Sequence, residues 1–430
     1  MARSTSAAWP RFDHGSCFAA PLDEGRGPRL SLTAAGGGML AGEQRYVPDS
    51  LVLETTLRGD GGCVRVTDAL TAGDERRLLR VVEGVEGRLD LRLRAAVRFD
   101  YGAVRPWLRR DAPDVVWAIG CDEEGRRFGR FALRSAAGHA DEMQIVFGID
   151  GERHLDEREV DLHGYGGARP VRVGNGAAGQ MQLDALGELV ALTWTWHRRG
   201  AACDEDEWRF VRSLVDMAAR RWREPDRGIW EWRAQPRHFV HSKAACWAAL
   251  DCGLRLADDL GADVDRELWR RERDAIRAAV FADGWDERRG CFRQALGAPE
   301  LDAAALLLPV TGIVGWDDER MRRTADAIAA ALGENGLVRR YEGDDGLPGR
   351  EGAFLACSFW LAEAYARQGR LDRARAVYDA VAATASPLGL LSEEHEGPGG
   401  AALGNYPQSL THLAQITAAD ALRKASAAPP

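Results

Sequence analysis

The spacing of apolar residues changes once along the chain, and this change limits the folds that are open to it. From residue 1 to about 135, segments such as 46–58, 63–70 and 115–120 alternate apolar and polar residues, with Gly-Asp, Gly-Gly and Glu-Gly turns between such segments. Alternation with a period of two places one face of each strand in a core. We therefore predict an antiparallel β-sandwich in a first domain, residues 1–140.

From about residue 179 the apolar period becomes helical. Amphipathic segments such as 204–223 roughly take turns with segments that are apolar nearly all round, such as 242–254 and 352–364. A helix that is apolar on every face is buried on every face, so the alternation predicts an inner ring of helices wrapped by an outer ring. The predicted fold class is therefore α+β, with a helical barrel over residues 141–430. The nine predicted helices lie near residues 179–199, 205–222, 241–260, 265–282, 302–308, 317–333, 352–369, 371–385 and 406–424.

Composition excludes several classes of function. The 430 residues carry a net charge of −9, which favours neither nucleic acid nor an anionic membrane as a partner. The eight cysteines are scattered, without the CxxC or Cys-His spacing of a zinc site. No apolar run is long enough to span a bilayer, and the first residues lack the apolar stretch of a signal peptide. We expect a cytoplasmic protein with no metal and no cofactor.

A first candidate site is the loop at residues 226–243. It places Glu231 between Trp230 and Trp232, with Arg233 beside them. A glutamate flanked by indole rings loses hydration, which suits a general acid. The alternative is a surface loop whose tryptophans cover the core of the domain, and the residues alone favour neither reading.

A second candidate is the loop at residues 390–413, where Glu393 and Glu394 precede glycine-rich backbone. Paired carboxylates in such a loop can activate water, although most such pairs are solvated charges. A third loop, residues 336–354, carries Arg340 and Tyr341 beside acidic residues. An arginine fork suits two neighbouring sugar hydroxyls, and the alternative is an acidic hairpin loop. A fourth loop, residues 283–309, is interpreted as a turn before a short buried helix.

These loops together resemble glycoside hydrolase family 15, the bacterial glucoamylase and trehalase-like proteins. The resemblance lies in GIWEWR with PRHFVHSK and CWAALD, in LDAAALLLP, in GLPGREGAFLACSFWL, and in LSEE with LGNYPQSLTHL. Segments such as YVPDSLVLET and RVTDAL resemble the β domain of the same family. The resemblance implies an N-terminal β-sandwich and a C-terminal (α/α)6 barrel.

The resemblance also implies roles for particular residues. The family inverts the anomeric carbon with two carboxylates about 6.5–9.5 Å apart, one as acid and one as base. By motif, Glu231 is the acid and Glu393 the base, while Glu394 is the less suitable base. Arg340 matches an arginine that binds sugar, with Tyr341 beside it. Trp230, Trp232 and Arg233 are the further predicted contacts to a glucoside, and the aromatic rings suit stacking on sugar faces.

One expected segment is missing. Members of the family carry a WDYRYCWLRDA-type segment that opens an early inner helix and grips the terminal glucose, and this chain has none. The end of the β-sandwich and the first three of twelve helices are absent as one block. Neighbouring helices would then expose apolar faces, and a loosely held sugar reacts far more slowly. We expect the chain alone to be impaired, or to act in an assembly such as a homo-oligomer.

Two other functions are compatible with the sequence. The first is a catalytically inactive remnant that binds carbohydrate or serves as a scaffold, which the missing segment favours. The second is a nucleotide-dependent enzyme, because Gly174, Gly176 and Gly179 have the GxGxxG spacing of a dinucleotide site. More helices follow that motif instead of a second parallel strand, which argues against this function. The leading hypothesis is a cofactor-free hydrolase of trehalose or of α-glucan ends.

Overall fold

The structure is a computed structural model of the whole chain. It describes residues 2–4, 6–8, 16–19, 29–35, 41–70, 78–96, 107–112, 115–119, 144–146, 154–200, 202–343, 351–397 and 399–427. Two units are distinguished by their internal contacts, one of residues 1–131 with 147–176 and one of residues 132–146 with 177–430. Most of the junction at residues 134–155 and the Gly-Leu-Pro-Gly turn at 346–349 lie outside the described residues.

The first unit is built from small antiparallel sheets. Four strands form one sheet in the order β5-β6-β7-β8, and three form another in the order β1-β4-β9. Leu32 of β4 shares a buried apolar cluster with Leu57 of β6 and with Val64 and Val66 of β7. The strands are β1 Ala2–Ser4, β2 Ser6–Ala8, β3 Ser16–Ala19, β4 Arg29–Ala34, β5 Ala41–Tyr46, β6 Leu53–Gly59, β7 Gly62–Leu70, β8 Leu78–Gly87, β9 Leu91–Ala96, β10 Trp107–Ala112, β11 Val115–Ile119, β12 Arg158–Val160 and β13 Val171–Val173.

The glycine motif of residues 174–179 falls where the first unit ends, at Gly176, and the second resumes, at Ala177. Strand β13 pairs antiparallel with β12, and a 3-10 helix, η4 (Gly176–Gly179), follows it. A dinucleotide site of the GxGxxG kind needs a parallel strand–helix–strand unit. The two-stranded antiparallel pair is a different arrangement, so the described structure gives the motif no such context.

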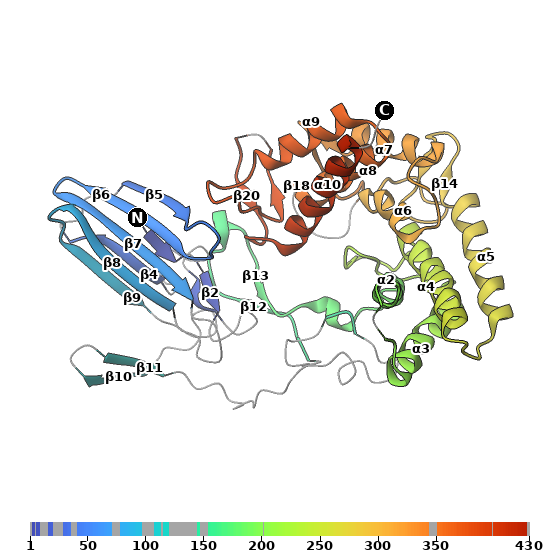
Figure 1. Cartoon of the computed structure of the whole chain (residues 1–430), viewed down its shortest axis with the longest axis horizontal. Coiled ribbons are helices and arrows are strands. Elements are labelled where there is room, and N and C mark those ends of the chain that lie inside the picture. The colour runs from blue at the N-terminus through green and yellow to red at the C-terminus, as the bar shows by residue number, and fades with distance from the viewer. Residues whose placement is uncertain are drawn as a thin grey trace. The chain divides into compact units, whose positions relative to one another are not determined.

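The second unit is helical. Nine α-helices occur in the described residues, and they are drawn from green to red in Figure 1. They are α2 Asp184–Arg198, α3 Glu205–Arg221, α4 Val240–Asp259, α5 Arg266–Ala282, α6 Leu308–Thr311 (after the 3-10 helix η5, Ala303–Leu307), α7 Glu319–Ala331, α8 Leu355–Arg367, α9 Leu371–Ala382 and α10 Ser409–Ala427. The mixed class predicted from the sequence is therefore confirmed. The sandwich and the closed barrel stay predictions.

The helices alternate in burial as the sequence predicted. In α8, twelve of 13 residues are buried, and in α4 fifteen of 20, so both are surrounded by other elements. The amphipathic helices α3, α5 and α9 pack against these two, α3 and α5 against α4 and α9 against α8. Short hairpins and bridges join the helices: β14 Trp285–Asp286 with β15 Cys291–Phe292, β16 Gly333–Glu334 with β17 Leu337–Val338, and β18 Ala353–Phe354 with β19 Glu394–His395 and β20 Ala402–Leu403.

Three predicted helix starts were early. The helix expected from residue 179 begins at Asp184, after the 3-10 helix η4 and a short non-helical stretch. The other two are those of α8 and α10. The helix expected from residue 352 begins at Leu355, because Ala353 and Phe354 pair instead with His395 and Glu394 in a β-bridge. The helix expected from residue 406 begins at Ser409, after Pro407, which has no N–H to donate. The starts of α8 and α10 both lie where the backbone turns into a candidate site loop.

Helix α10 has an unusual distribution of side-chain size. Its buried face carries Thr411 and the small residues Ala414, Ala418 and Ala421, whereas Leu413 and Ile416 are 60% and 63% exposed. Helix α2 likewise exposes Leu192 and Trp196. Helix α10 packs against α8 and α9. Helix α2 packs against α3 and α4. The exposed apolar residues therefore lie on the faces turned away from those neighbours.

The close packing of α10 gives a stability prediction. Ala418 is fully buried, so Ala418→Leu is expected to lower the free energy of unfolding by about 1–3 kcal/mol through overpacking. Ile416→Ser on the exposed face is the matched control, and it should change that free energy by no more than about 0.5 kcal/mol. Urea unfolding followed by circular dichroism measures both. Equal losses in the two variants would mean that the exposed face is covered in solution.

Candidate active site

Glu231 lies in a strained turn. Its φ of 53° is in the left-handed region, and its N–H donates to the Gly228 carbonyl at 3.2 Å. The other non-glycine residues with positive φ in the described chain are Asp49 and Asn335, types that adopt this conformation more readily. Strained backbone of this kind clusters at functional sites. The outlier therefore singles out Glu231 within its loop.

The rest of this turn is fixed by its surroundings. Gly228 has a φ of 61°, and a Cβ there would lie 2.8 Å from the Phe239 ring, so only glycine fits. The side chain of Gln180 donates to the Glu231 carbonyl at 3.3 Å. Glu231 as a residue is partly exposed. The contacts of Gly228 and Gln180 thus hold the backbone of Glu231 in this conformation.

Trp230, which precedes Glu231 in the sequence, is packed among aromatic side chains. Its indole N–H donates to Oδ1 of Asp302 at 2.8 Å. Its ring centroid lies 5.4 Å from that of Phe354, 5.8 Å from that of Trp360 and 6.2 Å from that of Tyr341. The ring is buried on most of its surface, so its contacts are mainly those of a core residue.

Trp232, on the other side, is still less exposed, at 3% of its surface. Its ring packs edge-on against Phe239 and Tyr341, with centroids 5.8 and 5.3 Å away. The ring therefore has almost no free face for a sugar in this structure, and it supports the site from behind. Arg233 is exposed next to it and has contacts of its own. The two tryptophans thus cover the core, as the alternative interpretation of the loop predicted.

Arg340 lies where the candidate loops meet. Its guanidinium carbon is 5.6 Å from the centroid of Trp230, 5.2 Å from that of Tyr341 and 5.5 Å from that of Phe354. Its Nε donates to Glu351 at 3.1 Å, and Nη2 donates to the other oxygen of the same carboxylate. A guanidinium carries five N–H donors, so an ion pair that uses two of them is compatible with binding a ligand.

Glu394 joins this group through charge. It lies in β19, opposite Phe354, and burial raises the pKa of its carboxyl. The positive charge of Arg340 opposes that rise in pKa, and the negative charge of Glu393 adds to it. Glu394 therefore interacts electrostatically with both Arg340 and Glu393.

Glu393 is held by the backbone on the opposite side of its loop. Its Oε2 accepts two hydrogen bonds from Asn405, from the main-chain N–H and from Nδ2, both at 2.9 Å. Its own N–H donates to the Asn405 carbonyl at 2.9 Å, and its carbonyl accepts from the N–H of Leu355 at 3.0 Å. Gly404 has a φ of 68°, and a Cβ there would lie 2.6 Å from Oε2 of Glu393.

Gly404 therefore gives a prediction about the position of Glu393. Gly404→Ala is expected to push the Glu393 carboxylate aside. On the predicted role of Glu393 as the base, it should also lower kcat about 10–100-fold, because catalysis depends on placement within about an ångström. Gly399→Ala is the matched control, since Gly399 also has positive φ, at 75°, but nothing lies within 4 Å of its added Cβ. Steady-state kinetics measures the effect. An equal fall in kcat for both variants would mean that backbone strain, and not contact with Glu393, is responsible.

Asp302 is a buried carboxylate that the sequence did not single out. It accepts hydrogen bonds from the Trp230 indole, from the N–H of Ala304 at 2.7 Å and from the Gln294 amide at 3.4 Å. Burial raises the pKa of Asp302 to about 6, and these hydrogen bonds oppose the rise. The residue precedes helix η5 and caps it, which is a recognisable sequence signal, but its contact with Trp230 spans 72 positions.

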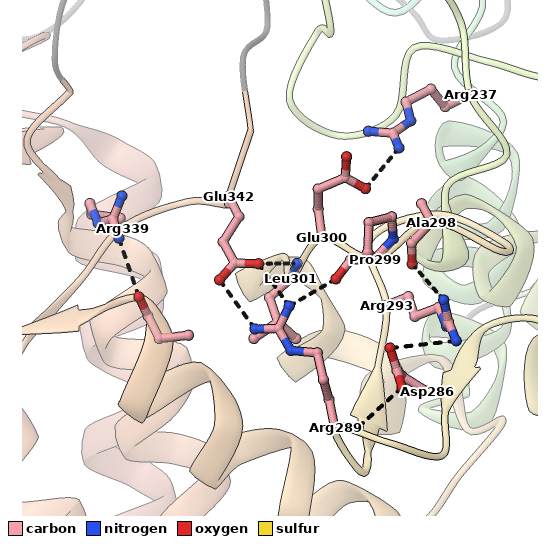
Figure 2. A network of polar contacts seen from close by, with 11 residues as sticks. Arg237, Asp286, Arg289, Arg293, Ala298, Pro299, Glu300, Leu301, Arg339 and Glu342 are labelled. Carbon is pink, nitrogen blue, oxygen red and sulfur yellow. Dashed lines mark hydrogen bonds and ion pairs between the residues drawn. The ribbon is translucent and has the colours of Figure 1, made fainter.

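A polar network outside the aromatic group fixes the backbone next to Asp302 and Arg340 (Figure 2). Arg289 donates to both oxygens of Glu342, at 2.9 and 3.1 Å, and to the Pro299 carbonyl at 2.8 Å. Glu342 also accepts from the N–H of Leu301 at 3.0 Å. The Arg289 hydrogen bonds lower the pKa of Glu342. The fourth loop of the sequence thus acts as a support, in agreement with its structural interpretation.

The same network holds the loop that carries Glu231. Arg237 donates to Glu300 at 3.0 Å and to the side-chain oxygen of Gln294 at 2.9 Å (Figure 2 shows the first of these). The N–H of Ala303 donates to the Arg340 carbonyl at 2.7 Å. Residues 299–303 are therefore joined to the loops of both Glu231 and Arg340.

A group of buried ionisable residues lies beneath the Glu231 turn. Oδ2 of Asp226 accepts from the N–H of Leu183 at 3.0 Å, the N–H of Gly228 at 3.1 Å and the Ser242 hydroxyl at 2.8 Å. Burial raises the pKa of Asp226, and its hydrogen bonds and the charge of fully buried Lys243 oppose the rise. Asp226 therefore ties the start of the Glu231 turn to helices α2 and α4.

Asp184, the first residue of α2, belongs to the same group. Burial raises the pKa of its carboxyl to about 7, and the charges of Asp226 and Glu188 add to the rise. Its Oδ1 is buried without a hydrogen-bond partner within the described structure. An ionised carboxylate in this place is therefore costly to the folded state.

The described residues contain no group of three or more His, Cys, Asp or Glu side chains arranged to hold a metal ion. Among the described helices, none combines the length and the apolar character that crossing a membrane requires.

Comparison with known proteins agrees with these features. Residues 112–420 match the glycosyl hydrolases family 15, and this stretch contains every candidate residue named above. The chain is 42% identical over 322 residues to the trehalase of Mycobacterium tuberculosis, covering 73% of this chain and 47% of that protein. It is 35% identical to the trehalase of Thermoplasma volcanium, covering 74% of this chain and 52% of that protein.

Solved structures show the same fold. A bacterial glucoamylase complexed with acarbose superposes with a TM-score of 0.51 at 15% identity, over 68% of this chain and 45% of that one. A glycosidase in complex with glucose superposes with a TM-score of 0.50 at 22% identity, over 60% of this chain and 72% of that one. These two likenesses concern the fold of the helical part, which is one found among glycosidases. The chain belongs to glycosyl hydrolases family 15, and it spans about half the length of the curated relatives that it matches.

Proposed function

We propose that this chain hydrolyses the terminal α-glucosidic bond of trehalose or of an α-glucan end, without a cofactor and with inversion at the anomeric carbon. The observation that carries the proposal is the strained backbone of Glu231, at a residue that is only partly buried. The sequence likeness to trehalases supports trehalose as the first substrate to test.

In the proposed reaction, Glu231 gives its proton to the glycosidic oxygen as the bond from that oxygen to C1 breaks. Glu393 takes a proton from a water molecule, whose oxygen bonds to C1 on the opposite face. The products are a β-configured glucose and the free alcohol, which is a second glucose when the substrate is trehalose. Solvent then returns a proton to Glu231 and removes one from Glu393.

The remaining candidate residues would bind the sugar. Arg340 and Glu394 lie beside the predicted base and offer donors and acceptors for hydroxyl groups, with Tyr341 and Trp230 packed around the guanidinium. Arg233 is exposed next to the acid turn. Trp232 would act through its packing, since its ring is buried.

We also propose that the chain by itself turns over slowly, because a segment that grips the terminal glucose in the family is missing from its sequence. The exposed apolar residues of α2 and α10 support this proposal, since such faces are normally covered. An assembly such as a homo-oligomer would cover them. Activity measured across a size-exclusion profile would contradict this if the monomer fraction had ordinary glycosidase turnover.

The test is glucose release from trehalose, maltose and short maltodextrins by the purified chain beside Glu231→Gln. Glucose from the wild type and none from the variant would support the proposed hydrolase and identify its substrate. Proton NMR during the first turnovers would show β-glucose if the reaction inverts. No glucose from any of these substrates, with a helical circular dichroism spectrum, would favour the inactive sugar-binding protein instead.

A further inference from the structure

Asn405 makes an unusually complete set of contacts with Glu393. Its main-chain N–H and its Nδ2 both donate to Oε2, and its carbonyl accepts from the N–H of Glu393. Both of these hydrogen bonds, one from the main chain and one from the side chain of Asn405, go to the same oxygen of the carboxylate. A carboxylate has two oxygens with lone pairs, so Oε1 is not used by Asn405.

The backbone around Asn405 is itself held in place. Strands β19 and β20 pair Glu394 with Leu403, directly before the contact between Glu393 and Asn405. After it, the N–H of Gln408 donates to the Leu391 carbonyl at 3.0 Å. Backbone hydrogen bonds on both sides of the Glu393–Asn405 pair therefore hold the two chain segments together. They fix the position of the Asn405 amide relative to Glu393.

From this geometry we infer that Asn405 is a positioning residue that orients the Glu393 carboxylate, fixing Oε2 so that Oε1 meets the attacking water. The inference rests on the proposed function, in which Glu393 is the base. Glu393 is only partly buried, so without the amide its carboxylate could rotate toward solvent. Hydrogen bonds to an ionised oxygen are also the stronger kind, which makes them suitable for this purpose.

The kinetic test compares Asn405→Ala with wild type on trehalose and on α-glucosyl fluoride. Fluoride leaves as a stable anion, so the second substrate depends on the base and little on the acid. We expect kcat of Asn405→Ala to fall about 10–100-fold on both substrates, with KM changed less than about threefold, because the loss is one of positioning. Asn405→Asp has the same shape but places a negative charge against Glu393, and it should lose more.

Two controls separate positioning from a general loss of structure. Gln408→Ala removes an amide from the same segment, one whose side-chain oxygen accepts from the N–H of Leu410, and it should keep kcat within about twofold. The melting temperature of Asn405→Ala should stay close to that of wild type. A kcat for Asn405→Ala equal to that of wild type would overturn the inference while leaving the proposed function intact.

A third measurement does not depend on turnover. Carbodiimide labelling followed by peptide mass spectrometry reports how accessible each carboxyl is, with Glu396 of the same loop as the internal reference. We expect labelling of Glu393 to rise severalfold in Asn405→Ala while that of Glu396 stays constant. Unchanged labelling of Glu393 would overturn the inference. If wild type releases no glucose from any glucoside, the proposed function fails, and this measurement still decides whether Asn405 holds Glu393.

Discussion

Glu231→Gln is expected to lower kcat on trehalose roughly 10²–10⁴-fold, the usual contribution of a general acid or base. The same variant should keep most of its activity on α-glucosyl fluoride, because that leaving group needs no proton. Glutamine has the shape of glutamate and is compatible with the Gln180 contact, which is made to the backbone of residue 231. The loss would therefore report on the proton and not on the fold.

Glu393→Gln should behave differently from Glu231→Gln. It is expected to lose activity on both substrates by a similar factor, because every substrate needs the water to be activated. Glu394→Gln is the neighbouring comparison, and a larger loss for it than for Glu393→Gln would exchange their roles. Steady-state kinetics on the two substrates distinguishes these outcomes.

Asp184→Asn is expected to stabilise the protein at pH 8 and to have little effect at pH 4. Burial raises the pKa of Asp184 to about 7 from the ordinary 3.8, so between these values the folded protein keeps a proton that the unfolded chain releases. Stability therefore falls as the pH rises from about 4 to about 7, and the loss is complete above that. One pKa unit corresponds to about 1.4 kcal/mol, so the variant should gain on the order of 1–4 kcal/mol at pH 8.

Urea unfolding at the two pH values measures this gain. Asp372→Asn is the matched control, because Asp372 also lies in the first turn of a helix, α9, but is exposed. It should lose about 0.3–1 kcal/mol at pH 8, through a weaker interaction with the helix dipole. A loss of stability for Asp184→Asn at pH 8 would mean that its charge is compensated by the buried group around Lys243.

The helices could be predicted from the sequence because their signal is local. The sequence of α4 and α8 is apolar on nearly every face, and that of α3 and α5 is amphipathic. Each pattern can be seen within its own segment, and these predicted ranges agree with the structure except at a few ends. The misplaced starts of α8 and α10 depend on β19 and on Pro407, and the pairing with β19 joins residues about 40 positions apart.

The candidate site was predictable in part for the same reason. Glu231, Glu393 and Arg340 stand in motifs that can be read within a few residues. Their supports could not be found in this way, since Asp302 meets Trp230 across 72 positions and Asn405 meets Glu393 across 12. The predicted stacking of Trp232 on sugar also required its packing against Phe239 and Tyr341 to be known.

The left-handed backbone at position 231 determines which amino acids are favoured there when the sequence evolves. Glycine adopts this conformation without strain, whereas another residue there costs about 1–3 kcal/mol. A single base change converts a glutamate codon into a glycine codon. In a chain whose position 231 mattered only for folding, that change would be favourable and readily reached. A glutamate at this position is therefore what selection for its carboxyl would retain, and what relaxed selection on an inactive scaffold would tend to lose.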